Sequence, residues 1–416
     1  MTIYAKRREE FAKNMKENSL LVVFAGYAKI KRGDEVYPFV PQRNFYYLTG
    51  LDVPNLILFI LKDQKGELKY KLLLERYDET VAKWDGAVLI QEDARAISGI
   101  EEYGFVDGFY KDIENIFVRE RIEQVFLDME NRSFSSENSS ELNLAKDIKE
   151  KFPHIDIKNA YPILADLRCI KSEEELVLLQ KAVDISVKGF YKLLDNVKPG
   201  MMEYELEAHL DYIYKSHGCK DRAFATIMAA GKNAAVLHYH NNDCKISEDD
   251  LILADFGAQW CWYSSDITRT FPASGKFTQR QKQLYNIVLE GGEMIIDMLK
   301  PGIEFSTLNE SLKEYYVKEL KQIGLIKDEE ELINYYYHGV AHMLGLETHD
   351  LSLQRGLNVE LKEGMVLTVE PGLYIKDEGI GIRIEDDVVI TKDGCNVLTK
   401  NAIKSVEDIE EYMAKR

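Results

Sequence analysis

Hydrophobic residues in the first 167 positions occur in short runs, some typical of strands and others with the spacing of an amphipathic helix. The pattern predicts helices over 4–18 and 138–151, and strands over 20–24, 56–60, 70–74 and 123–127. Strands and helices that alternate over this length are typical of one small layered domain. We therefore expect an N-terminal α/β domain over residues 1–167.

A clear helix start follows this part of the chain. Ser172 lies three residues before Glu175, which is the spacing of a capping box, and a periodic apolar pattern covers 173–194. Residues 202–217 have the pattern of a second helix. Residues 171–416 are therefore expected to form a second, larger domain.

The larger domain contains a weak internal repeat. The tripeptide Lys-Pro-Gly occurs at 198–200 and again at 300–302, each time between two helical stretches, and strand-like sequence follows both helix pairs. The second pair is expected over 279–299 and 307–323. The matching order indicates a duplicated half-domain. The expected fold class is therefore α/β (α+β), with the small domain first in the chain.

Four strand-like apolar runs of the larger domain carry a carboxylate at one end. These carboxylates are Asp255, Asp266, Glu370 and Glu385. Strands this rich in Val, Ile and Leu are usually core strands, and burying an ionised carboxylate there is costly unless a counter-charge is present. Few lysines occur in these segments, so divalent metal is the expected counter-charge.

Composition narrows the classes of function. The 416-residue chain has a net charge of −18, which argues against binding nucleic acid or an anionic membrane. No apolar run reaches the roughly 18 residues of a membrane span, and the first residues lack the apolar segment of a signal peptide. Five cysteines without regular spacing fit a reducing compartment. We expect a cytoplasmic protein.

The four carboxylates fall into two pairs. Residues 257–264 and 371–379 join the paired strands, so two hairpins would each bring two acids to one face. His338 and His342 can supply a fifth ligand, although Gly339 stands where an HExxH zinc helix has glutamate. This hard ligand set favours Mn²⁺, with Co²⁺, Fe²⁺ or Zn²⁺ as substitutes. Two such ions about 3.5–4 Å apart can activate water and polarise a carbonyl.

In order and spacing, these residues resemble aminopeptidase P (Xaa-Pro aminopeptidase), one of the pita-bread metallopeptidases that also include prolidase, methionine aminopeptidase and creatinase. The segments that carry the resemblance cover nearly the whole chain: 37–39, 44–50, 168–172, 253–257, 265–272, 338–345, 368–374 and 381–387. The resemblance implies a creatinase/prolidase-type N-terminal domain. It also implies a pita-bread catalytic domain with pseudo-twofold halves and a curved antiparallel sheet.

The resemblance also implies the roles of the metal ligands. Asp255 would bind one ion, Asp266 and Glu385 would bridge both ions, and His342 and Glu370 would hold the other. Glu370 would also serve as the catalytic, proton-handling base.

Three further histidines match substrate-facing positions of the family: His238, His338 and His349. A neutral imidazole there can hydrogen-bond the scissile carbonyl or the leaving nitrogen, and we count His238 and His349 among the catalytic residues. Arg383 lies two residues before Glu385, so a strand places both on one face. There Arg383 is expected to bind substrate or, together with Tyr374, to orient the carboxylates, and an ordinary salt bridge is the alternative. His240 has no matching role and is expected on the surface.

The activity implied is release of the N-terminal residue from peptides whose second residue is proline. Prolidase, which acts on Xaa-Pro dipeptides with the same five ligands, remains an alternative. A non-catalytic peptide-binding protein on this fold is disfavoured because the ligand set is complete. Relatives form dimers or tetramers, so we expect a homo-oligomer by analogy. In it, Trp84 either reaches a neighbouring subunit's active site or is a core residue.

Overall fold

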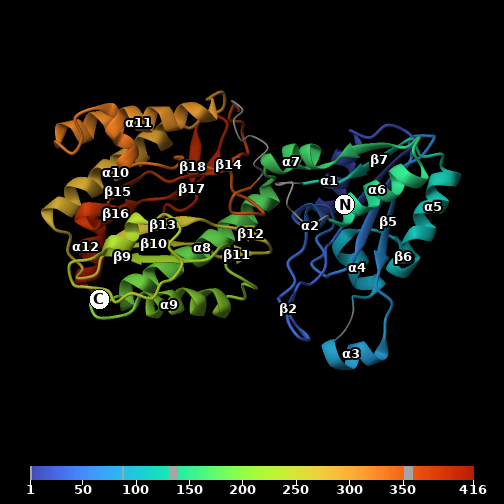
Figure 1. The fold of residues 1–416 in the computed structure, drawn as a ribbon, viewed down its shortest axis with the longest axis horizontal. Helices are drawn as coiled ribbons and strands as arrows, with labels where there is room; N and C mark the ends of the chain where they lie inside the picture. The colour runs from blue at the N-terminus through green and yellow to red at the C-terminus, as the bar shows by residue number, and fades with distance from the viewer. Residues whose placement is uncertain (1, 87–88, 131–138, 351–358) are drawn as a thin grey trace. The chain divides into compact units, whose positions relative to one another are not determined.

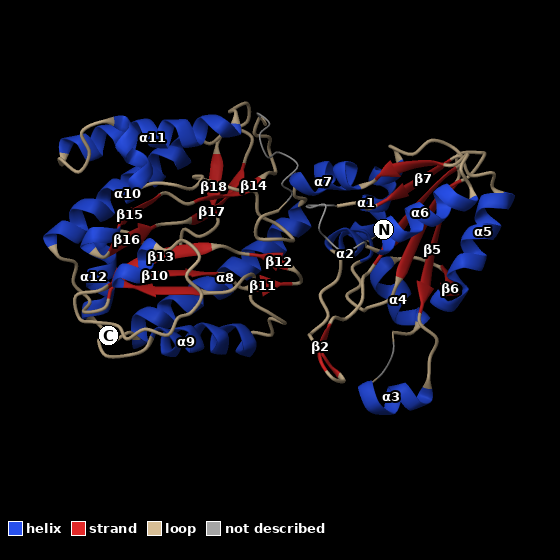
Figure 2. Ribbon diagram, viewed as in Figure 1, coloured by secondary structure: helices blue, strands red, loops and turns tan. Residues whose placement is uncertain are grey.

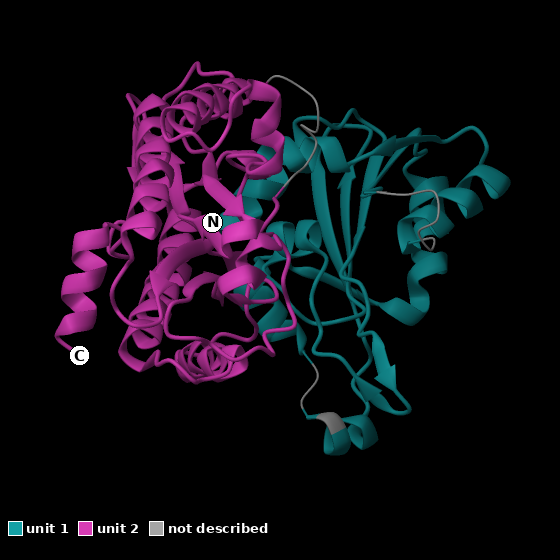
Figure 3. Ribbon diagram, turned by 60° about the vertical axis from the view of Figure 1, so that its left-hand side comes forward, with its two compact units in different colours: residues 1–167 teal, residues 168–416 magenta. Residues whose placement is uncertain are grey.

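The computed structural model describes residues 2–86, 89–130, 139–350 and 359–416 (Figure 1). The chain divides into two compact units, Met1–Leu167 and Arg168–Arg416 (Figure 3). Within the described ranges, no helix is both long and apolar enough to cross a membrane.

Unit 1 is built on one mixed six-stranded sheet. Its strands have the order β6-β5-β4-β1-β7-β8, with β1 antiparallel to β4 and parallel to β7. The elements are α1 (Ile3–Ala12), β1 (Ser19–Phe24), β2 (Ile30–Arg32), β3 (Glu35–Val36), α2 (Arg43–Thr49), β4 (Ile57–Lys62), β5 (Leu68–Leu74), α3 (Glu79–Asp85), α4 (Gln91–Ser98), β6 (Glu102–Phe105), α5 (Phe109–Arg119), β7 (Gln124–Leu127), α6 (Ser140–Lys151), β8 (Asp156–Asn159) and α7 (Tyr161–Cys169). The four predicted strands are all present in this sheet.

The first helix is shorter than the pattern predicts. It ends at Ala12 instead of residue 18. Lys62, from β4, donates to the carbonyl oxygens of Ala12 and Met15, which satisfies acceptors that the helix end leaves open. Met15 is buried although it lies beyond the helix, because its side chain fills the core where the chain turns toward β1. Trp84 on α3 is 84% exposed, so the interpretation as a core tryptophan is wrong.

Unit 2 consists of two similar halves. Figure 2 shows its strands between two helix pairs. The first half comprises α8 (Glu173–Asn196), α9 (Glu203–Ser216), β9 (Ile227–Ala230), the 3-10 helix η2 (Gly231–Ala235), β10 (Leu251–Phe256), β11 (Gln259–Trp260), β12 (Tyr263–Ser264) and β13 (Ile267–Pro272). The second comprises α10 (Gln279–Met298), α11 (Phe305–Gln322), the 3-10 helix η3 (Glu329–Asn334), β14 (Val366–Val369), β15 (Gly372–Ile375), the 3-10 helix η5 (Lys376–Glu378), β16 (Ile380–Arg383), β17 (Asp386–Ile390), β18 (Cys395–Val397) and α12 (Val406–Ala414).

The two Lys-Pro-Gly turns have the same backbone geometry. Gly200 and Gly302 have φ angles of 94° and 92°, a left-handed region that favours glycine. The N–H of Gly200 donates to the carbonyl of Ile246, and that of Gly302 donates to the carbonyl of Leu361. Each turn is thus hydrogen-bonded to a later segment of its own half, at Ile246 or at Leu361. The duplicated half-domain expected from the tripeptides is present.

Each half contributes one three-stranded antiparallel sheet, in the orders β13-β10-β9 and β14-β17-β18. The predicted capping box opens α8, where Ser172 and Glu175 exchange side chain to backbone hydrogen bonds. The long first helix of each half begins at such a box, since Thr278 and Gln281 form the same arrangement before α10. The mixed α/β architecture with two related halves confirms the predicted fold class.

Candidate active site

Equivalent positions of the two central hairpins carry the four carboxylates. Asp255 lies near the end of β10, and Asp266 immediately precedes the partner strand β13. In the second half, Glu370 immediately follows β14 and Glu385 immediately precedes β17. The register therefore brings each pair together at one end of its hairpin, as the sequence pattern predicts. The second connection additionally folds back as the β15–β16 hairpin.

One cleft of about 280 Å³ collects these side chains. Every site residue expected from the sequence lines it: Asp255, Asp266, Glu370, Glu385, His342, His238, His338, His349 and Arg383. The cleft also has an apolar wall, formed by Phe224, Ala225, Ile227 and Leu237, and His240 and Thr348 complete the lining.

His342 lies at the centre of the carboxylates. Its Nε2 atom lies 3.4 Å from an oxygen of Asp266, 3.6 Å from one of Glu370 and 3.9 Å from one of Glu385. Its Nδ1 atom lies 3.2 Å from the carbonyl oxygen of Met343, so this nitrogen carries the proton. The Nε2 lone pair therefore faces the carboxylates, which is the tautomer that a metal ligand requires.

The donor set fits divalent cations. One donor atom each from Asp266, His342 and Glu385 lie within 4.8 Å of one another. One carboxylate oxygen of Asp255 forms an ion pair with Arg383 at 2.5 Å, while its buried Oδ1 atom has no hydrogen-bond partner among the described residues. A buried carboxylate oxygen without a donor is costly unless a cation satisfies it. These residues are therefore suited to hold metal.

Crowding and burial raise the pKa of three of these carboxylates. Desolvation raises the pKa of Asp266 and of Glu370 well above the ordinary value, and the nearby charge of Glu385 adds to both shifts. Desolvation followed by the charge of Asp255 raises the pKa of Glu385 to about 7. The protein without metal therefore retains protons here near neutral pH, and a bound cation would displace them.

Metal uptake is expected to release protons and to strengthen as pH rises. Because the raised carboxyl pKa values make protons compete with the cation, the apparent affinity for Mn²⁺ should rise at least about tenfold from pH 6 to pH 7.5. Calorimetric titration of metal-free protein in buffers with different ionisation enthalpies measures both effects. An affinity independent of pH, with no proton release, would show that the carboxylates are already ionised.

A chain of hydrogen bonds lies beside the carboxylates. Arg383 donates to the Tyr374 hydroxyl at 2.9 Å, and that hydroxyl lies 2.9 Å from Nε2 of His338. Nδ1 of His338 lies 2.7 Å from the carbonyl of Gly339, so Nδ1 carries the proton and Nε2 accepts from Tyr374. Desolvation, followed by the charge of Arg383, lowers the pKa of His338 to about 4. This imidazole is neutral at physiological pH.

The other cleft histidines come from two loops. The ring of His349 packs edge-on against that of His342, with 4.4 Å between the ring centroids. His238 and His240 stack with their rings 6.1 Å apart and 13° from parallel. Both are exposed and line the cleft. His240 therefore lies in the site, although the sequence offered no role for it.

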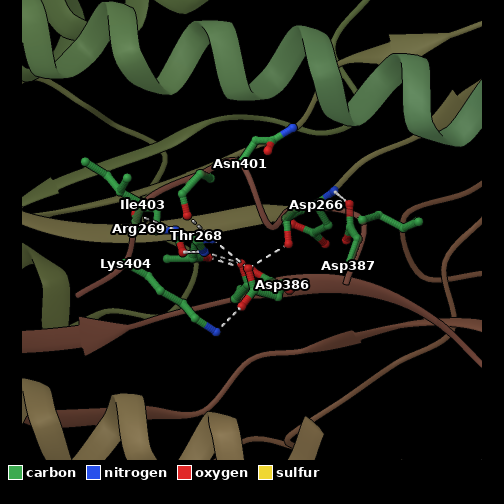
Figure 4. Close-up of polar contacts among 12 residues, drawn as sticks. Asp266, Thr268, Arg269, Asp386, Asp387, Asn401, Ile403 and Lys404 are labelled. Carbon is green, nitrogen blue, oxygen red and sulfur yellow. Dashed lines mark hydrogen bonds and ion pairs between the residues drawn. The ribbon is translucent and has the colours of Figure 1, made fainter. Parts of the chain in front are cut away.

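Three residues that hold the carboxylates in place were not predicted from the sequence: Thr268, Arg269 and Asp387 (Figure 4). The Thr268 hydroxyl donates to Glu385 at 2.6 Å, and Asp387 accepts the backbone N–H of Asp266. The buried Arg269 guanidinium donates to the backbone carbonyl of Glu385 and to the side chain of Asp386. The signal was available, since an arginine inside the apolar β13 strand needs a buried acceptor as much as the carboxylates need a cation.

Both parts of the chain match known protein families. The model of metallopeptidase family M24 matches residues 177–392, and that of the aminopeptidase P N-terminal domain matches residues 4–126. A Xaa-Pro aminopeptidase from Haemophilus influenzae is 32% identical, over 99% of this chain and 96% of the relative.

Two solved structures extend the likeness to three dimensions. A chain from Bacillus anthracis is 44% identical and has a TM-score of 0.97, over 99% of this chain and 98% of that one. Zinc-substituted aminopeptidase P from Escherichia coli, in complex with product, is 30% identical with a TM-score of 0.92, over the same shares of the two chains. The chain therefore belongs to metallopeptidase family M24 and carries the N-terminal domain of aminopeptidase P.

Proposed function

We propose that this metallopeptidase releases the N-terminal residue from peptides whose second residue is proline. The observation that carries the proposal is the convergence of four carboxylates and His342 in one cleft of an M24 fold. The relatives named Xaa-Pro aminopeptidase cover nearly the whole chain, including the N-terminal unit. This coverage favours a peptide substrate of the same kind here.

The resemblance to aminopeptidase P implies the ligand roles. Asp255 would hold one cation, Asp266 and Glu385 would be shared by two, and His342 and Glu370 would hold the second. Two cations bound there would lower the pKa of water and polarise the scissile carbonyl. Mn²⁺ is the proposed metal, because oxygen ligands outnumber nitrogen ligands four to one.

The protein's own groups would handle the protons. Glu370 lines the cleft, and the resemblance implies that it accepts a proton from water and delivers it to the leaving nitrogen. A prolyl nitrogen has no N–H in the peptide bond and must gain a proton to leave. His238 and His349, on the cleft lining, are placed to hydrogen-bond the peptide.

Arg383 would supply a positive charge in the cleft without binding metal itself. In the absence of metal it is the counter-ion of Asp255, and it also donates to Thr268 and Tyr374. Its fixed positive charge is suited to a peptide carboxylate or carbonyl. We further propose that the protein is cytoplasmic and forms a homodimer or homotetramer. In this oligomer the exposed Trp84 of one protomer would reach the active site of a neighbouring subunit.

A peptide series tests the activity. Protein loaded with Mn²⁺ is expected to release the first residue from Xaa-Pro-Xaa tripeptides and longer peptides, and to leave matched Xaa-Ala-Xaa peptides largely intact. Released amino acids are quantified by chromatography at several peptide lengths. Cleavage of Xaa-Pro dipeptides alone would indicate a prolidase, and no release from any Xaa-Pro peptide would refute the proposal.

A further inference from the structure

A buried carboxylate lies behind the loop that carries His238 and His240. This carboxylate belongs to Glu203, which opens α9 and has no exposed surface. The loop covers residues 231–244, between β9 and the strand-like segment at Lys245. Glu203 lines no part of the cleft, and the proposed chemistry does not use it.

Glu203 fastens both ends of this loop and its middle. Oε1 accepts the N–H of Ala230 at 2.8 Å and the side-chain amide of Asn233 at 2.9 Å. Oε2 accepts the Tyr239 hydroxyl at 2.8 Å and the N–H of Cys244 at 2.9 Å. The backbone N–H of Glu203 in turn donates to the carbonyl of Cys244 at 3.0 Å. One side chain therefore fixes the loop at its start, centre and end.

Tyr239 is the link between this anchor and the cleft. Its hydroxyl reaches Glu203, and its ring packs against a small apolar cluster that includes Tyr374. The residues on either side of it, His238 and His240, both line the cleft with stacked rings. Tyr239 thus points toward α9 while its two neighbours face the substrate space.

The same residues do not form a second metal site. Donor atoms of Glu203, Asp243 and Cys244 lie within 4.8 Å of one another. Both carboxylate oxygens of Glu203, however, already accept two hydrogen bonds each from N–H and O–H donors. A cation would have to displace donors that hold the backbone, so the arrangement is typical of a structural hub.

We propose that Glu203 and Tyr239 are positioning residues that hold His238 against the bound peptide. The inference rests on the proposed function, because it concerns the same cleft. The hydrogen bonds of Glu203 restrict the conformations of residues 231–244, although His238 and His240 are exposed. The His238 imidazole therefore loses little conformational entropy when the peptide binds.

The test is a double-mutant cycle between Tyr239→Phe and His238→Ala. The phenylalanine variant retains the packed ring and removes only the hydroxyl, so it should fold. In the parent background we expect kcat/KM on an Xaa-Pro-Xaa peptide to fall about tenfold, the usual effect of removing a group that orients a functional side chain. In the His238→Ala background the same change should alter kcat/KM less than about twofold, because Tyr239 acts through His238.

A matched control and a second readout complete the design. Tyr412→Phe also removes a tyrosine hydroxyl bound to a carboxylate, that of Asp195 at 2.9 Å, but on α12 outside the cleft, and it should leave kcat/KM unchanged. Hydrogen exchange of residues 231–244 should quicken in Tyr239→Phe and in Glu203→Gln, but not in Tyr412→Phe.

The outcomes separate this inference from the proposed function. Equal losses of kcat/KM from Tyr239→Phe in both backgrounds, or unchanged exchange in the loop, would overturn the positioning role. A parent protein that cleaves no Xaa-Pro peptide would refute the proposed function instead, and the exchange experiment would still report on the anchor.

Discussion

Replacing Glu385 with glutamine is expected to lower kcat/KM on Xaa-Pro-Xaa peptides by about a thousandfold or more. Glutamine has the same shape, and its amide oxygen can still accept the hydrogen bond from Thr268. It lacks the charge that would hold two cations, however. Losing about 4 kcal/mol of transition-state stabilisation corresponds to a factor of about a thousand. Metal analysis after dialysis against Mn²⁺ should show substoichiometric metal in the variant.

The same substitution should stabilise the protein when metal is absent. The pKa of Glu385 in the folded protein is about 7, above the ordinary value of 4.5. A raised carboxyl pKa contributes stability that is fully present below the unfolded-state pKa and is lost as pH rises through the folded-state value. At pH 8 the parent therefore bears the full cost of ionising Glu385, up to about 3 kcal/mol, and the glutamine variant avoids it.

Thermal unfolding of metal-free protein at two pH values checks this sign. At pH 8 the Glu385→Gln variant should unfold at a higher temperature than the parent, and at pH 4.5 the difference should nearly vanish. Thr399→Val, which removes a buried hydroxyl near Asp386 and no charge from the cleft, serves as the control without this pH signature. A variant less stable than the parent at pH 8 would contradict this prediction.

The cost of burying charge determines how much of the site could be predicted. Asp255 and Glu370 could be found because an ionised acid at the end of an apolar strand requires a counter-charge, and the hairpin connections then set the pairs. The order of the sequence motifs along the chain predicted the family and the fold class, and the family and structure comparisons confirm both. The two Lys-Pro-Gly tripeptides also indicated the repeat, because each stands between two helical stretches that strand-like sequence follows.

The prediction from charge was incomplete because it considered lysines as counter-charges, and of the two buried arginines only Arg383 was expected beside the carboxylates. Few lysines lie near the acids, but Arg269 and Arg383 lie on β13 and β16 and pair with Asp386 and Asp255. Sequence spacing does not show which acid meets which arginine, since the partners lie 117 and 128 residues apart. The hydrogen-bond chain from Arg383 through Tyr374 likewise depends on how β15 and β16 fold back.

His240 shows a second limit. Its neighbour His238 matched a motif and His240 did not, yet both line the cleft. Their common orientation follows from Tyr239, which turns toward a carboxylate on α9 that lies 36 residues earlier in the chain. Local patterns carry no information about such a contact.

Replacing Arg269 with methionine should cause the largest loss of stability among these substitutions. Arg269 is fully buried and donates to Asp386, to the carbonyl of Glu385 and to those of Thr268, Ala402 and Ile403 (Figure 4). Methionine fills similar space but removes all five of these hydrogen bonds, and Asp386 keeps only Thr399 and Lys404 as side-chain donors. Breaking a buried ion pair by removing one partner costs about 3–5 kcal/mol, so unit 2 should unfold at a clearly lower temperature.

The pKa of Asp386 predicts how the stability loss in Arg269→Met depends on pH. Burial alone would raise the pKa of Asp386. The charges of Arg269 and Lys404 instead hold this pKa well below its usual range. Such a group contributes stability above the unfolded-state pKa that is lost as pH falls through the folded-state value. Without Arg269, the pKa of Asp386 should rise, so the stability deficit should be full at neutral pH and should shrink as pH falls below the ordinary carboxyl value of 3.8.

A second substitution separates the charge from the packing. Arg269→Met/Asp386→Asn should recover part of the lost stability, because a neutral amide is less costly to bury than a carboxylate that keeps only Lys404 as its counter-charge. Metal affinity should stay about tenfold or more below the parent in both variants, since neither restores the donor that fixes the Glu385 backbone. Full recovery of metal binding in the double variant would show that Arg269 acts only through Asp386. No loss of stability in Arg269→Met would show that the buried pair contributes nothing to the fold.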